Sequence, residues 1–187
     1  MALSDLLAQN VFVRWVFGDR HRYDLALSMA SLKLGERLLH VGCGDAALLA
    51  ALSAKVGYTG RAAAVDPDAA RAARAAQDVE RRGVLAEVQH APVGNFPFEA
   101  DAFDVVVFDV RALGSRDVPP AVDEARRVLR PGGRCLAIGG GSGRAATQAA
   151  DAFAGLLREH RFSGARVLAA REGLWFAEGL KARGDTR

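Results

Sequence analysis

The chain has 187 residues, of which 50% are hydrophobic, and this is typical of one folded domain rather than of a disordered segment. No apolar run approaches the roughly 18 residues needed to span a bilayer, and the N-terminus lacks the basic-then-apolar layout of a signal peptide, so we expect a soluble, cytoplasmic protein. The formal net charge of +3 is spread along the chain without a basic stripe, which argues against nucleic acid or a membrane as a partner.

The first half of the chain alternates short apolar runs with helical stretches. Residues 1–35 have an amphipathic helical pattern, and we expect them to cap a core formed by residues 36–181. The apolar runs predict buried strands, and the alanine-rich stretches predict helices. In chain order we expect strand 37–41, helix 46–56, strand 61–65, helix 67–82 and strand 86–90.

The second half continues this alternation but ends differently. Residues 103–108 give the clearest strand signal because β-branched residues are frequent there. Pro131-Gly132-Gly133 is expected to stop the helix that precedes it. In chain order we expect strand 103–108, helix 119–129, strand 135–138, helix 145–160, and strands 165–169 and 174–178 joined by a turn.

This order of elements predicts an α/β fold with a doubly wound, mostly parallel sheet and helices on both faces. The strands are continuously apolar rather than alternating, which indicates burial on both faces. Two final strands joined by a turn predict an antiparallel hairpin at the end. We expect a single domain over residues 1–187.

Two features at strand ends point to an adenosine ligand. In an open α/β sheet, ligands lie beyond the carboxyl ends of the strands. The first predicted strand ends at Gly42-Cys43-Gly44, where glycines let the backbone approach a ligand and the next helix offers free N–H groups. The second predicted strand ends near Asp66, 24 positions after Gly42, where a carboxylate can accept hydrogen bonds from ribose hydroxyls.

The glycine pattern Gly42-x-Gly44-x-x-Ala47 also fits the dinucleotide fingerprint. However, Asp45 would place a negative charge near a pyrophosphate. We also expect no separate substrate domain after the nucleotide fold. S-adenosylmethionine has no phosphate and carries an ammonium and a sulfonium, so nearby carboxylates favour it.

Four segments carry a resemblance to a known family: residues 38–45 around the glycines, 65–68 around Asp66, 103–107, and 127–134 with its Pro-Gly-Gly. Together with the final helix and hairpin, they resemble the class I S-adenosylmethionine-dependent methyltransferases, of the small single-domain, type 11-like kind, over roughly residues 20–181. The resemblance implies a Rossmann-like, seven-stranded sheet in the order 3-2-1-4-5-7-6, with strand seven antiparallel.

The resemblance also implies the site residues. S-adenosyl-L-methionine would be the cofactor, and Asp109, just past the fourth strand, would be catalytic. We expect these cofactor-binding residues: His40, Gly42, Cys43, Gly44, Asp66, Pro67, His90 and Ala91.

Three positions depart from the family pattern. His40 and Ala91 stand where the family usually or often has an acidic residue, and Ala46 stands where it usually has a third glycine. His40 would then bind in the cofactor network or simply be a buried, hydrogen-bonded strand histidine. His90 would stack on adenine or merely end a strand.

The chemistry needs few groups, because the sulfonium is already an activated leaving group and the enzyme mainly aligns methyl and nucleophile. A general base is needed only for a neutral hydroxyl or amine. Asp109 would be that base, a metal ligand as in the catechol-type branch, or a hydrogen-bond partner of the local backbone. We expect no metal, because the two cysteines, Cys43 and Cys135, and the four histidines do not have the spacing of metal ligands. Weaker candidates for a catalytic role are Arg111, His21 and Tyr23. Trp15 and Phe17 would line an acceptor pocket or, as aromatic residues at helical spacing more often do, pack in the core.

The function expected from the sequence is S-adenosylmethionine-dependent methyl transfer to a small-molecule acceptor by in-line displacement, in a monomer or homodimer. One alternative is a catalytically inactive, cofactor-binding or regulatory paralogue, which the three departures motivate. A nicotinamide-dependent reductase is the other alternative.

Overall fold

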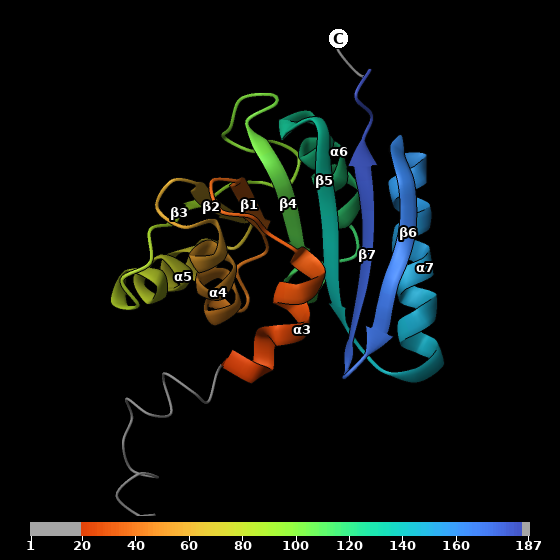
Figure 1. The fold of residues 1–187 in the computed structure, drawn as a ribbon, viewed down its shortest axis with the longest axis horizontal. Helices are drawn as coiled ribbons and strands as arrows, with labels where there is room; N and C mark the ends of the chain where they lie inside the picture. The colour runs from red at the N-terminus through yellow and green to blue at the C-terminus, as the bar shows by residue number, and fades with distance from the viewer. Residues whose placement is uncertain (1–19, 185–187) are drawn as a thin grey trace, which may run out of the picture.

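The computed structural model describes residues 20–184, with side chains from Tyr23 onward. Their strands form one seven-stranded sheet with helices on both faces (Figure 1). The strands are β1 (Arg37–Val41), β2 (Arg61–Asp66), β3 (Glu87–His90), β4 (Phe103–Asp109), β5 (Leu129–Gly140), β6 (Phe162–Arg171) and β7 (Leu174–Lys181). The helices are α3 (Arg20–Ala30), α4 (Ala46–Val56), α5 (Ala69–Arg81), α6 (Val118–Val128) and α7 (Gly143–Glu159), with a 3-10 turn η2 (Val110–Ala112).

The strand order is β3-β2-β1-β4-β5-β7-β6. The pairs among β1 to β5 are parallel, and β7 runs antiparallel to both β5 and β6. The predicted fold class, strand order and terminal hairpin are therefore confirmed.

The central strand β1 contributes side chains to both layers of the core. Leu39 and Val41 pack in the cluster that α6 and α7 cover, whereas Leu38 packs in the cluster that α3 and α4 cover. Side chains two residues apart share a face of a strand, so His40 projects toward the α3 and α4 side with Leu38. Strand β1 thus carries a polar group into an otherwise apolar layer.

Side-chain caps begin the two helices that follow β1 and β2. Asp45 accepts a hydrogen bond from the backbone N–H of Leu48, and Asp68 accepts one from that of Arg71, and each aspartate is the N-cap of its helix. The predicted start of the second helix at Pro67 was wrong, because Asp68 is the cap and the helix begins only at Ala69.

Strand β5 is longer than the sequence predicted. The expected bounds were 135–138, but pairing begins at Leu129, which lies opposite Phe103. The register then shifts, so that Arg134 pairs with Val105. The Pro-Gly-Gly segment therefore interrupts the ladder inside the strand instead of separating a helix from a strand, as extra residues in a bulge do.

The N-terminal cap predicted over residues 1–35 is described only from residue 20, where α3 begins. Trp15, Phe17 and the side chain of His21 lie outside the described residues. The domain bounds stay a prediction. In the part of the chain that the structure describes, no helix is long and apolar enough to cross a membrane.

Candidate functional site

The carboxyl ends of β1, β2 and β4 meet at one edge of the sheet. Since β1 pairs with β2 on one side and β4 on the other, the strand order reverses here, and such a switch point is where open α/β sheets bind ligands. The structure brings together three predicted features at this edge: the glycine loop 42–44, Asp66 and Asp109.

The glycine loop lies directly against the segment that follows β4. A Cβ added to Gly42 would lie 2.8 Å from the carbonyl oxygen of Asp109, and one added to Gly44 would lie 2.8 Å from the Cβ of Ala112. Gly42 also has a φ of +91°, which favours glycine. The two glycines therefore allow η2 to approach the loop closely.

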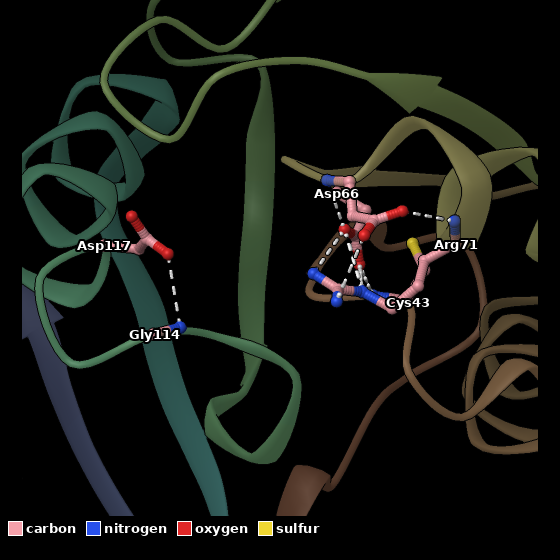
Figure 2. A network of polar contacts seen from close by, with 6 residues as sticks. Cys43, Asp66, Arg71, Gly114 and Asp117 are labelled. Carbon is pink, nitrogen blue, oxygen red and sulfur yellow. Dashed lines mark hydrogen bonds and ion pairs between the residues drawn. The ribbon is translucent and has the colours of Figure 1, made fainter.

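Asp66 is the centre of a buried polar network, which Figure 2 shows. Its Oδ2 accepts a hydrogen bond from the Cys43 N–H at 2.6 Å, and its Oδ1 accepts one from the Asp68 N–H at 2.7 Å. The Arg71 guanidinium pairs with the same carboxylate, Nη2 lying 2.9 Å from Oδ1. Asp66 thus ties the glycine loop to the start of α5.

A ribose that reached Asp66 would have to replace one of these partners. The two backbone N–H groups are fixed by the fold, whereas the Arg71 side chain is 32% exposed at the end of a flexible stem. Arg71 is therefore the partner that can leave.

The remaining residues predicted for the adenosine end lie nearby. Strand pairing sets His90 opposite Asp66, and the Ala91 N–H donates to the Asp66 carbonyl at 3.2 Å. His90 is exposed and Ala91 buried, while Pro67 is partly exposed beside them. Pro67, His90 and Ala91 thus form one edge of the site, and a binding role for them stays a prediction.

Cys43 is buried within the loop. Burial and the nearby Asp66 carboxylate raise the pKa of this thiol to about 12. Since the thiolate is the reactive form of cysteine, the side chain is a packing group at neutral pH and not a nucleophile.

His40 is fully buried, and neither ring nitrogen has a hydrogen-bond partner within residues 20–184. The simpler sequence interpretation expected a hydrogen-bonded strand histidine, and the structure gives the burial without the hydrogen bond. Burial lowers the pKa of His40 against the opposing effect of the Asp109 and Asp45 carboxylates, so the imidazole is neutral at pH 7.

Asp109 is 1% exposed and forms a two-pronged ion pair with Arg111. Arg111 Nε donates to Oδ1 and Nη2 donates to Oδ2, each at 2.8 Å. These hydrogen bonds raise the pKa of Arg111 above its usual value. The Arg111 guanidinium therefore occupies both carboxylate oxygens of Asp109.

Tyr23, another weaker sequence candidate, also belongs to the site. Its hydroxyl donates to Asp45, at 2.8 Å from Oδ1 and 3.0 Å from Oδ2. This bond fixes the carboxylate beside the glycine loop and connects α3 with α4. The sequence held no signal for the pairing, because 22 residues separate the partners.

Two cavities open at this edge, and Arg111 lines both. The polar one, about 440 Å³, is lined by Gly44, Asp45, Asp109, Arg111 and Ala112. The smaller one, about 180 Å³, has both apolar and charged side chains in its lining, which consists of Tyr23, Ala26, Leu48, Arg111, Ile138, Glu172 and Leu174. Across residues 20–184, no three His, Cys, Asp or Glu side chains gather as metal ligands would.

The sequence profile of a family described as "Methyltransferase domain" matches residues 38–133, more than half of the chain. The chain therefore belongs to this family, and the class I methyltransferase resemblance read from the motifs is confirmed.

Individual relatives are more distant. A "2-phytyl-1,4-naphtoquinone methyltransferase" of Trichormus variabilis is 28% identical over 128 residues, which are 66% of this chain and 56% of that protein. The chain thus spans little more than half the length of this relative.

Solved structures share the fold. A SAM-dependent methyltransferase from Aquifex aeolicus superposes with a TM-score of 0.73 at 19% identity, over 88% of this chain and 93% of that one. The [4+2]-cyclase SpnF superposes with a TM-score of 0.66 at 16% identity, over 87% and 80%. Because a cyclase has the same fold, the fold alone does not define the reaction.

Proposed function

We propose that this protein transfers the methyl group of S-adenosylmethionine to a small, ring-shaped acceptor. The single observation that carries the proposal is the polar cavity at the glycine loop, where carboxylates and a guanidinium converge at the switch point of a methyltransferase-family sheet.

The residues present fit this cofactor. The loop has glycines where a side chain would collide with η2, and the surrounding charges are mainly carboxylates, which suit a cationic ligand better than a pyrophosphate. Asp66 would hold the ribose after Arg71 leaves, and Pro67, His90 and Ala91 would contact the adenine. Gly42, Cys43 and Gly44, in the loop that follows His40, would contact the methionine part.

The cofactor supplies a methyl group on a sulfonium, which needs no further activation. The work of the protein is then to align the acceptor and to exclude water. Ile138, Leu48 and Leu174 give the smaller cavity an apolar wall. Arg111, at the boundary of the two cavities, would orient an acceptor oxygen and favour its deprotonated form.

Asp109 was expected to be catalytic. In this proposal its role is to hold Arg111 in place, because both carboxylate oxygens are already engaged with the guanidinium. Proton removal would therefore depend on the acidity of the acceptor beside Arg111.

For the acceptor, we propose a hydroxylated naphthoquinone or a similar phenol. A cavity that combines an apolar wall with the Arg111 cation, with Glu172 also in its lining, suits a flat ring that carries a hydroxyl. The relative from Trichormus variabilis, a 2-phytyl-1,4-naphtoquinone methyltransferase, supports the same class.

The test combines binding and turnover. S-adenosylmethionine and S-adenosylhomocysteine should raise the melting temperature while NAD does not, since a ligand at about 100 times its Kd stabilises by about 2.7 kcal/mol. Methyl transfer to a panel of hydroxylated naphthoquinones, phenols and amines is then followed by release of S-adenosylhomocysteine. No stabilisation by either sulfur ligand at millimolar concentration would refute the cofactor, and stabilisation by NAD alone would favour a reductase.

Nothing in the comparisons favours the inactive paralogue or the reductase. Tight binding of S-adenosylmethionine without turnover on any acceptor would favour the inactive paralogue over the enzyme.

A further inference from the structure

The polar cavity has a charge pattern that matches an amino acid. Its charged lining consists of the Asp45 and Asp109 carboxylates and the Arg111 guanidinium, which leaves one net negative charge. The methionine part of the proposed cofactor has a carboxylate, an ammonium and a sulfonium, which leave one net positive charge. The cavity therefore offers a partner of opposite sign for each charged group.

Arg111 has hydrogen-bonding capacity left over. Its Nε and one Nη2 hydrogen serve Asp109, and the guanidinium has five N–H groups in all. The side chain is 34% exposed, and it lines both cavities. Of the three N–H groups that remain, two can bind a second carboxylate while Asp109 keeps Arg111 in position, and one is left for an acceptor oxygen in the smaller cavity.

Asp45 is the carboxylate with an acceptor site to spare. Its Oδ1 receives both the Tyr23 hydroxyl and the Leu48 N–H, at 2.8 and 3.2 Å. Its Oδ2 shares only the Tyr23 hydroxyl, at 3.0 Å. An ammonium in the cavity can therefore bind Oδ2 without breaking the cap of α4.

His40 lies on β1 just before the glycine loop that borders the polar cavity. It is fully buried, and its ring nitrogens have no partner among the residues that the structure describes. On β1 it lies two residues before Gly42, and it pairs with Val107 of β4, two residues before Asp109. A neutral imidazole supplies no counter-charge for an ammonium, so a carboxylate must come from elsewhere.

We infer that Arg111 binds the carboxylate and Asp45 the ammonium of the cofactor's amino-acid end. The inference rests on the proposed function and deepens it, because it assigns recognition of the methionine part to residues outside the glycine loop's backbone. Asp109 then acts as a positioning residue for Arg111.

Calorimetry with two ligands isolates this contribution. S-adenosylhomocysteine has the amino-acid end, and 5′-methylthioadenosine has the same adenosine and thioether without it. In the full chain, Arg111→Gln and Asp45→Asn should each weaken S-adenosylhomocysteine binding about 10- to 100-fold, as expected for the loss of a bond to a charged group. Binding of 5′-methylthioadenosine should not change.

Two choices keep the test decisive. Arg166→Gln is the matched control, because Arg166 also pairs with a carboxylate, that of Glu178, but is 70% exposed, lies on the edge strand β6 and does not line the cavity. Asp45→Asn keeps an N-cap residue as good as aspartate, so it reports on binding even if Arg111→Gln fails to fold. Equal weakening of both ligands, or no weakening of either, overturns the inference. Wild-type protein that binds neither ligand refutes the proposed function instead.

Discussion

Asp66→Asn is the substitution for which the structure gives the sharpest expectation. The carboxylate accepts the Cys43 N–H on one oxygen and the Asp68 N–H on the other, at 2.6 and 2.7 Å. An amide has a single acceptor oxygen, so one buried N–H would face an NH₂ group. Arg71 would also lose its anionic partner.

The two losses differ in size. A buried N–H without a partner costs about 1–3 kcal/mol, and the pair with the partly exposed Arg71 adds up to about 1 kcal/mol. We therefore expect Asp66→Asn to lower the free energy of unfolding by about 1–4 kcal/mol, or the melting temperature by roughly 2–16 °C for a chain of this size.

Urea denaturation of the ligand-free protein measures this loss. Asp68→Asn is the control, because asparagine caps a helix as well as aspartate and the Arg71–Asp68 pair is long, at 3.6 Å, and exposed. A loss below about 1 kcal/mol for Asp66→Asn, or equal losses for the two variants, would show that the network around Asp66 does not hold the loop to α5.

Three further predictions follow from local features. Gly44→Ala should lower the free energy of unfolding by about 1–3 kcal/mol, because the added Cβ crowds Ala112. Gly155→Ala inside α7, where a Cβ meets nothing within 4 Å, should raise it by about 0.5–1 kcal/mol. Equal shifts in the melting temperatures of the two variants would contradict this. The Cys43 thiol, with its pKa raised to about 12, should resist a thiol reagent at pH 8 until urea unfolds the chain, and rapid native labelling would refute its burial. Burial acts to raise the pKa of Asp104, but hydrogen bonds from Arg130 and Arg37 outweigh it and lower the value to about 2. The stability that Asp104 contributes is present above the unfolded pKa near 4 and is lost as the pH falls toward 2, so Asp104→Asn should cost about 1 kcal/mol at pH 6 and little at pH 2; a cost independent of pH would argue against the ion pairs.

The sequence predicted those features of the fold and the site that depend on residues close together in the chain. The glycine loop and Asp66 follow apolar strands, and strand ends at one edge of a parallel sheet meet whatever the side-chain details. The pairs Tyr23–Asp45 and Arg71–Asp66 were not predicted, because charged and polar side chains of a helix have many possible partners until the helix is docked. Arg111 is an intermediate case. The sequence suggested it as a candidate, but its ion pair with Asp109 depends on the backbone conformation of η2, which the sequence analysis did not predict.

The bounds of β5 were missed for a different reason. Pro131-Gly132-Gly133 is a strong local signal for an interruption, and an interruption does occur there. Local chemistry does not say whether an interrupted segment rejoins its neighbours. Here Leu129 pairs with Phe103 before the interruption, which only the position of β4 determines.

The pairing of Arg71 with Asp66 also affects the affinity of this site for the adenosine part of a ligand. If the ribose binds Asp66, it displaces a guanidinium and not solvent, so association is an exchange between two partners of one carboxylate. The displaced group stays tethered five residues along the chain, and a tethered competitor has an effective concentration on the order of millimolar. The same short connection would favour dissociation after methyl transfer. Arg71 stays close to Asp66, so it can pair again with the carboxylate when S-adenosylhomocysteine dissociates. Fast release of product would then be a property of the ligand-free network itself.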